Sequence, residues 1–328
     1  MRAAWYEATG PARGVLRVGA LPDPTPGPGE VLVAVAASGI NPHDTKRRAG
    51  WRGMVMPFPR VVPQADGAGV IRAVGPGVPA SRVGERVWLW GGLPARPMGT
   101  AAELCAVAAD RAVSLPDGIE FADGACLGVP ACTAHKAVFA DGSVAGKTVL
   151  VSGAAGAVGH FAAQMAASDG ARVIATVSSP EKAAHARAAG ATHVIDYRHE
   201  DVAARIRDIV GSHGVDRIIE VDFGANAALD ASIIAEHGVI AAYSSTSQPE
   251  PVLPYYPLQH KAATLRFIQG LLLNESARRA AVDAITAGLR AGKLKATIAR
   301  RFPLAEIAAA HEHLESGQAM GKVIVEIS

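Results

Sequence analysis

The chain has 328 residues, of which 49% are hydrophobic and 19% charged, and 32 basic against 30 acidic residues give a formal net charge of +2. This length exceeds what one hydrophobic core usually serves, so we expect two domains with a cleft between them. The composition leaves no stretch polar enough for a disordered arm, and the absence of a long Lys and Arg run argues against a nucleic-acid partner.

The apolar segments are too short to predict a membrane protein. The longest runs from Val31 to Ile40, about half of what a spanning helix needs. Residues 2–6 are typical of a strand and not of a signal peptide, which favours a cytoplasmic location. The chain has three cysteines, Cys105, Cys126 and Cys132. This odd number and the absence of CxxC spacing suit neither a disulfide framework nor a cysteine-built zinc site. We expect each to be a small buried side chain.

In chain order, the first 120 residues or so carry short β-rich runs separated by Gly and Pro, namely 31–35, 69–71 and 86–90. This pattern predicts a compact, mostly antiparallel barrel. From Lys147 onward apolar strands alternate with helices, which is typical of a parallel sheet covered on both faces. The predicted fold class is therefore α/β, with a mostly β barrel domain and a Rossmann-type, doubly wound parallel-sheet domain.

The second part of the chain is expected to consist of repeated βα units. Strands are predicted over 148–152, 172–177, 193–196, 216–221 and 238–242. Helices are predicted from about 157 and over 180–189, 201–210 and 226–235. After about residue 262 we expect an amphipathic helix over 276–291 and a last strand, 322–327, that returns to the first domain. The predicted domains are 1–122, completed by 263–328, and 123–262.

The sharpest motif is a glycine-rich turn after the first of these strands, where residues 149–159 read VLVSGAAGAVG. Gly156 leaves room for backbone N–H groups and the helix N-terminus to meet a pyrophosphate, and Gly159 permits close helix–strand packing. Ala154 stands where the usual fingerprint has its first glycine. A tight turn without a ligand is the alternative, but five βα units in order favour a dinucleotide site. We assign to it Ala155, Gly156, Ala157, Val158 and Gly159.

The end of the second strand predicts which dinucleotide binds, because NAD enzymes place an acidic residue there for the ribose hydroxyls. This chain has Ser178 and Ser179, followed by Lys182 on the next helix. A missing carboxylate removes repulsion toward a 2′-phosphate, and the lysine adds a counter-charge. By itself Lys182 also fits an ordinary solvated lysine, but beside the serines it favours NADPH over NADH. Tyr243, just after the strand 238–242, is also assigned to the cofactor site.

With these residues the chain resembles the zinc-independent quinone oxidoreductases, the zeta-crystallin-like branch of the medium-chain dehydrogenase/reductase superfamily. The resemblance runs nearly end to end. It rests on segments 28–33, 38–42, 66–70, 83–87, 115–118, 128–134, 302–304, 310–311 and 321–323. Residues 146–164 come close to the quinone-reductase signature, with Gln164 in its place, while Ala157 and Ala167 depart from that signature.

The resemblance implies a GroES-like barrel joined to a Rossmann domain, usually in a homodimer formed through the Rossmann sheets. It also implies that Lys182 and Tyr197 contact the 2′-phosphate of NADPH. Asn41 and Thr133 would border the nicotinamide and the substrate, which makes them candidate catalytic residues.

Zinc dehydrogenases of the superfamily carry a Cys where this chain has Asn41, a His where it has Ala65, and a Glu where it has Asp66. Neither an amide nor a methyl group is a soft or imidazole donor. The four-cysteine structural lobe is also missing, since only Cys105 lies in that region. We therefore expect no metal.

The leading hypothesis is zinc-free hydride transfer from NADPH to a quinone or a similar conjugated carbonyl. The alternatives are an enoyl or alkenal double-bond reductase of the same fold, which needs a proton donor, and a non-catalytic NADPH-binding redox sensor. His43, two positions beyond Asn41, is a candidate donor because imidazole titrates near neutral pH. It could equally pack at the cleft wall. Basic residues nearby, such as Lys46, Arg47 and Arg52, leave the substrate open.

Overall fold

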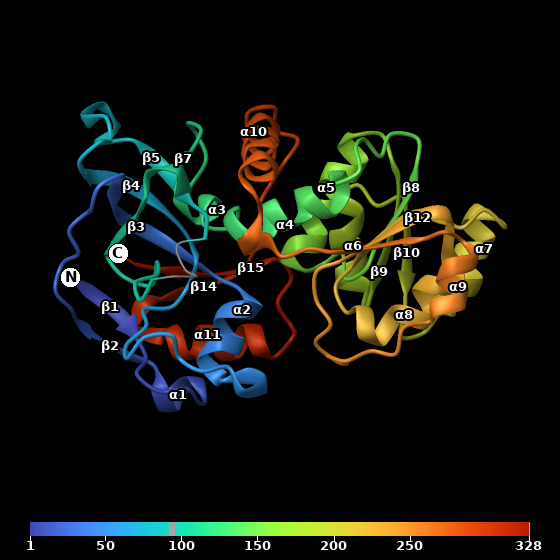
Figure 1. Cartoon of the computed structure of the whole chain (residues 1–328), viewed down its shortest axis with the longest axis horizontal. Coiled ribbons are helices and arrows are strands. Elements are labelled where there is room, and N and C mark those ends of the chain that lie inside the picture. The colour runs from blue at the N-terminus through green and yellow to red at the C-terminus, as the bar shows by residue number, and fades with distance from the viewer. Residues whose placement is uncertain (92–95, 328) are drawn as a thin grey trace. The chain divides into compact units, whose positions relative to one another are not determined.

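The computed structural model of the chain describes residues 1–91 and 96–327. The chain forms two compact units, the first of Met1–Val129 with Lys295–Ser328 and the second of Pro130–Leu294. Figure 1 shows a sheet with flanking helices in each. Within the described residues, no helix combines the length and the apolar character that crossing a membrane requires.

The first unit is built on a seven-stranded sheet with the order β14-β15-β3-β4-β5-β7, and β6 pairs with β3. All its pairings are antiparallel except β14 with β15. The strands of this unit are β1 (Arg2–Trp5), β2 (Arg17–Ala20), β3 (Glu30–Ile40), β4 (Asp66–Val74), β5 (Arg86–Leu89), β6 (Leu104–Ala108), β7 (Ala112–Ser114), β14 (Ile298–Pro303) and β15 (Lys322–Glu326). Short helices cover it: α1 (Ala12–Val15), α2 (Pro42–Ala49), α3 (Phe121–Gly124) and α11 (Ile307–Glu315), with single turns η1 (Trp51–Gly53), η2 (Ala80–Arg82), η3 (Ala109–Arg111) and η5 (Leu304–Glu306).

Strand β3 organises this core because its side chains alternate. Val31, Val33 and Val35 are buried, whereas the residues between them are only partly buried. This is the period of two that a sheet with one core face requires. The C-terminal strand β15 pairs with β3, so the predicted return of the chain end to the first domain is confirmed.

The second unit contains a six-stranded parallel sheet with the order β10-β9-β8-β11-β12-β13. In chain order this is 3-2-1-4-5-6, the Rossmann arrangement. Its strands are β8 (Thr148–Val151), β9 (Arg172–Val177), β10 (His193–Asp196), β11 (Val215–Glu220), β12 (Ile234–Ala242) and β13 (Thr264–Phe267). Its helices are α5 (Ala157–Ser168), α6 (Pro180–Ala188), α7 (Val202–Val210), α8 (Phe223–Ile233), α9 (Tyr255–His260) and α10 (Glu275–Arg290), and it also contains the single turn η4 (Gly270–Leu272). Helix α4 (Gly128–Phe139) begins in the first unit and continues into the second.

Helices lie on both faces of this sheet because right-handed crossovers run outward from β8 in two directions. Helices α5 and α6 link β8, β9 and β10, while α8 links β11 and β12 on the opposite face. The strand order reverses between β8 and β11, and the carboxyl ends of the strands at such a point are where Rossmann-type sheets bind dinucleotides.

The predicted α/β fold class is confirmed, and the five strands predicted for the second domain all form. Strand β13 was not predicted. It pairs with β12 and extends the sheet, and residues up to Leu294 group with the second unit. The sequence-based boundary at 262 therefore differs from the structural one, because β13 and α10 both belong to the second unit.

Candidate active site

The glycine-rich turn joins β8 to α5 in the second unit and leaves the helix N-terminus open. A Cβ atom at position 159 would lie 2.5 Å from the carbonyl oxygen of Gly153, so only glycine allows this approach of helix and strand. Gly156 is the N-cap of α5, and a Cβ there would touch only the same oxygen, at 3.4 Å. Unpaired N–H groups at such an N-terminus, together with the helix dipole, favour a phosphate.

The residues predicted to select the cofactor lie together at the ends of β9 and β10. Ser179 is the N-cap of α6, and its hydroxyl accepts a hydrogen bond from the backbone N–H of Lys182. The Lys182 ammonium lies 3.1 Å from the hydroxyl of Ser178. Tyr197 donates its backbone N–H to Val177, which brings it beside this group, and its side chain is 51% exposed. Tyr197 is exposed and Ser179 and Lys182 are partly buried, whereas Ser178 is buried beneath the lysine ammonium.

A cavity of about 470 Å³ opens at the same end of the sheet. Ser152, Gly153, Thr176 and Tyr197 line one part of it, and carboxylate side chains of β11 and α8 line another. The open turn, the cavity and the lysine are what a dinucleotide needs at this place: room, backbone donors and a counter-charge. These residues therefore fit NADPH, with Lys182 and Ser178 able to hold a phosphate.

The acidic side of this cavity was missed at the sequence level. Glu220 and Asp230 are almost completely buried, and Glu220 accepts hydrogen bonds from the backbone of Asp222 and the amide of Asn226. Burial, with a contribution from Glu220, raises the pKa of Asp230 to about 9. Burial also raises the pKa of Tyr243, whose backbone N–H donates to Glu220. An acidic residue at the end of an apolar strand was the only available signal.

The other predicted site residues are distributed over both units. Thr133 lies on α4 in the second unit and is buried. Asn41 and His43 lie in the first unit, where Asn41 follows β3 directly and is the N-cap of α2. Burial, followed by Arg47 and Lys46, lowers the pKa of His43.

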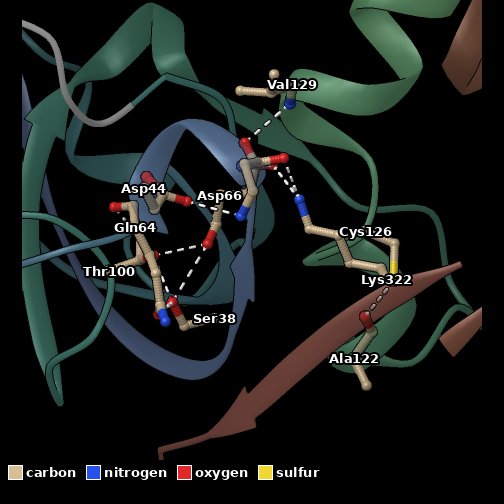
Figure 2. Close-up of polar contacts among 10 residues, drawn as sticks. Ser38, Asp44, Gln64, Asp66, Thr100, Ala122, Cys126, Val129 and Lys322 are labelled. Carbon is tan, nitrogen blue, oxygen red and sulfur yellow. Dashed lines mark hydrogen bonds and ion pairs between the residues drawn. The ribbon is translucent and has the colours of Figure 1, made fainter. Parts of the chain in front are cut away.

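Asn41 makes hydrogen bonds to Asp44, Asp66 and Lys322, which lie in a buried polar cluster of the first unit that Figure 2 labels. The Lys322 ammonium donates to the amide oxygen of Asn41 at 2.6 Å and to the Asp66 carboxylate at 2.7 Å, and the Asn41 amide nitrogen donates to the same carboxylate oxygen at 2.7 Å. Asp44 accepts a bond from the Asn41 backbone N–H at 2.8 Å. Burial raises the pKa of Asp44 to about 7.

Comparison with known proteins decides the family. Residues 27–117 match the alcohol dehydrogenase GroES-like domain, and residues 189–325 match a family described as zinc-binding dehydrogenase. The chain is 33% identical to a human quinone oxidoreductase over 92% of its own length and 90% of that protein. It is 31% identical to a 2-haloacrylate reductase from Burkholderia sp, with 92% of each chain covered.

This chain belongs to the quinone oxidoreductase branch of the medium-chain dehydrogenase/reductase superfamily.

Solved structures agree with this assignment. An NAD-dependent alcohol dehydrogenase superposes with a TM-score of 0.91 at 29% identity, over 100% of both chains. The quinone oxidoreductase of Escherichia coli, crystallised with NADPH, superposes with a TM-score of 0.88 at 25% identity over 99% of this chain and 100% of that one. Relatives of this quinone oxidoreductase-like chain thus support a nicotinamide cofactor.

Zinc does not fit this member of the superfamily, although one matched family is described as zinc-binding. An amide and a methyl group stand at Asn41 and Ala65, and neither is a zinc ligand. The carboxylate at the third position, Asp66, is paired with the Lys322 ammonium at 2.7 Å. Throughout residues 1–91 and 96–327, no group of three or more His, Cys, Asp or Glu side chains could hold a metal ion. No catalytic step is therefore assigned to a metal.

Proposed function

We propose that this protein reduces a quinone or a similar conjugated carbonyl with NADPH and without zinc. The preference for NADPH over NADH rests on one observation: the Lys182 ammonium lies 3.1 Å from Ser178 Oγ at the end of β9. NAD enzymes have a carboxylate at this place. A charge-assisted bond to a phosphate is worth about 1.5–3 kcal/mol. The proposal assigns the 2′-phosphate contact to Lys182, Ser178, Ser179 and Tyr197, and the pyrophosphate to residues 155–159.

When bound, NADPH supplies the hydride, and a proton from solvent completes the reduction of the acceptor. The chain must then hold the acceptor and exclude water. The proposal gives Asn41 and Thr133 the task of bordering the nicotinamide and the acceptor. After hydride transfer a quinone needs only one proton to become the hydroquinone and can take it from water, so its reduction requires no dedicated acid.

A second candidate is the reduction of a conjugated double bond, which the similarity to a 2-haloacrylate reductase favours. This reaction adds hydride to one carbon and a proton to its neighbour, so it benefits from a proton donor at the site. His43 is the donor that this second candidate would use.

The proposal includes a homodimer formed through the second unit. Among the described residues, β13 ends the strand order of its sheet and pairs only with β12. Exposed large hydrophobic side chains gather in the surrounding segment: Val252, Leu253, Tyr255, Tyr256, Phe267 and Leu272. An unpaired edge beside such side chains is typical of an interface. Light scattering should give twice 33.7 kDa, Phe267→Asp should shift the mass toward one chain, and Val83→Asp in the first unit should not.

The cytoplasmic location expected from the sequence stays part of the proposal. Cys105, Cys126 and Cys132 are buried free thiols, which suits a reducing compartment.

The test is NADPH and NADH oxidation with a panel of quinones, enones and acrylates. Turnover with quinones at a higher kcat/KM for NADPH than for NADH is expected. Turnover restricted to acrylates would instead support the double-bond reductase. Tight NADPH binding with no turnover on any acceptor would contradict both and indicate a redox sensor.

A further inference from the structure

Asn41, Asp66 and Lys322 form a closed triangle of hydrogen bonds inside the first unit, part of which Figure 2 shows at the Asp66 carboxylate. Their side chains are almost inaccessible, since the exposed fractions are 5% for Asn41, 0% for Asp66 and 2% for Lys322. The second carboxylate oxygen of Asp66 accepts the backbone N–H of Val129 at 2.8 Å. Both carboxylate oxygens of Asp66 and the Lys322 ammonium therefore have hydrogen-bond partners, which a buried ion pair needs to offset the loss of hydration.

The triangle allows only one orientation of the Asn41 amide. An ammonium can only donate hydrogen bonds and a carboxylate can only accept them, whereas an amide does one at each end. The amide oxygen must therefore face Lys322 and the amide nitrogen must face Asp66. Reversing the amide would place two donors together and two acceptors together, at the full cost of unsatisfied buried groups.

Lys322 is held in place by the sheet itself. Val323 pairs with Ile40 in the antiparallel register of β15 and β3, so Lys322 lies opposite Asn41. Gly39 leaves space for the lysine stem, because a Cβ at position 39 would lie 2.7 Å from its Cε atom and 2.2 Å from the carbonyl oxygen of Ala125. The position of the ammonium thus follows from strand pairing and from one glycine.

We propose that Lys322 is a positioning residue that fixes the side chain of Asn41. The inference rests on the proposed function, in which Asn41 borders the nicotinamide and the acceptor. A fixed amide keeps that border rigid, and a misplacement of about 1 Å can cost roughly 100-fold in rate. The same ammonium explains why the chain can keep the buried Asp66 carboxylate without a metal.

Removing the lysine alone cannot separate this role from simple charge balance. Lys322→Met leaves Asp66 buried as an uncompensated charge, which destabilises any fold. The informative variant is Lys322→Met with Asp66→Asn, which removes both charges at nearly constant volume. The amide introduced by Asp66→Asn can still accept the Val129 N–H, but it both donates and accepts, whereas the introduced methionine side chain has no N–H to offer. The Asp66–Lys322 ion pair is then removed without leaving either partner as an uncompensated charge, and that pair no longer dictates the orientation of Asn41.

Turnover and stability of the double variant form the first arm of the test. We expect an unfolding temperature close to that of the wild type, NADPH affinity by fluorescence within about twofold, and kcat lowered roughly 10- to 100-fold. Lys261→Met is the matched control, because the Lys261 ammonium donates to backbone carbonyls of Ser232 and Ile234 in the second unit. This control should lose stability and keep kcat. A double variant as active as the wild type would overturn the positioning role.

The second arm does not depend on activity. In protein labelled with ¹⁵N only at asparagine side chains, the Asn41 NH₂ signal is identified by its loss in Asn41→Ala. It should exchange slowly with solvent in the wild type and faster in the double variant. Equal protection in both would overturn the inference. If the wild type reduces no acceptor at all, the proposed function fails while this arm still decides the orientation of Asn41. Stoichiometric zinc in the purified protein, required for turnover, would also overturn the inference.

Discussion

His160 on α5 and His185 on α6 stack on one another, with ring centroids 4.2 Å apart and ring planes inclined by 26°. Burial, together with His185, lowers the pKa of His160 to about 4, and burial also lowers the pKa of His185. Both imidazoles are therefore neutral in the folded protein at neutral pH. The contact ties together the two helices whose N-termini form the predicted phosphate sites.

Acid should weaken the second unit through this pair. In the unfolded chain a histidine binds its proton near pH 6.5, so the unfolded state gains protons first as the pH falls. The stabilisation is complete above about pH 6.5 and is lost toward pH 4, with about 2 kcal/mol lost by pH 5 for His160. His160→Phe should therefore reduce the fall in unfolding temperature between pH 7.5 and 5, measured by calorimetry. The exposed His193 provides the control His193→Gln, and an identical fall in His160→Phe and wild type would contradict the assignment.

Alanine substitutions at the two glycines of the β8–α5 turn should affect stability and cofactor binding differently. Gly159→Ala places a Cβ 2.5 Å from Gly153 O and should destabilise the protein, whereas Gly156→Ala meets an ordinary contact of 3.4 Å and has no unfavourable φ angle. We expect Gly156→Ala to keep the unfolding temperature and weaken NADPH binding, because its methyl group lies where the phosphate should approach. Thermal melts and NADPH titrations measure both. Unchanged NADPH affinity in Gly156→Ala would place the pyrophosphate elsewhere.

Lys182 should determine the preference for NADPH. Loss of one charge-assisted bond, worth about 1.5–3 kcal/mol, predicts that Lys182→Ala weakens NADPH binding roughly 10- to 150-fold and leaves NADH nearly unchanged. Fluorescence titration with both nucleotides measures the ratio. Lys147→Ala, at an exposed lysine of the same unit, should alter neither affinity. Equal losses for NADPH and NADH would rule out a 2′-phosphate contact at Lys182.

His43 should matter little for quinones. Because burial lowers its pKa, the imidazole is mainly neutral at pH 7, and any pH limb that it causes should lie below the usual histidine range. We expect His43→Gln to change kcat with quinones by less than about threefold. As a proton donor, His43 would contribute about 10²–10⁴-fold with a conjugated carbonyl, and its removal would erase the pH limb.

The measurement is kcat across pH on both substrate types, with the exposed His199→Gln as control. A change of less than about threefold on both substrates would assign His43 to the wall of the site.

Much of the second unit could be predicted from the sequence because its signals are local. The strands 172–177 and 193–196 have the predicted bounds. The first of them is the short, nearly continuous apolar run that is expected of a strand buried on both faces. Ser178, Ser179 and Lys182 could be found for the same reason. They follow one strand end within five residues, and their bonds span only three or four positions.

Only the tertiary structure decided the environment of Asn41. Lys322 is 281 residues away from Asn41 along the chain, and its sequence neighbourhood, residues 321–323, gives no sign of a contact with Asn41. No local pattern connects the two residues, because the pairing of β15 with β3 brings them together. The buried carboxylates Glu220 and Asp230 depend likewise on how α8 packs on its sheet. Propensity and periodicity describe neighbours along the chain, whereas burial and charge pairing depend on neighbours in space.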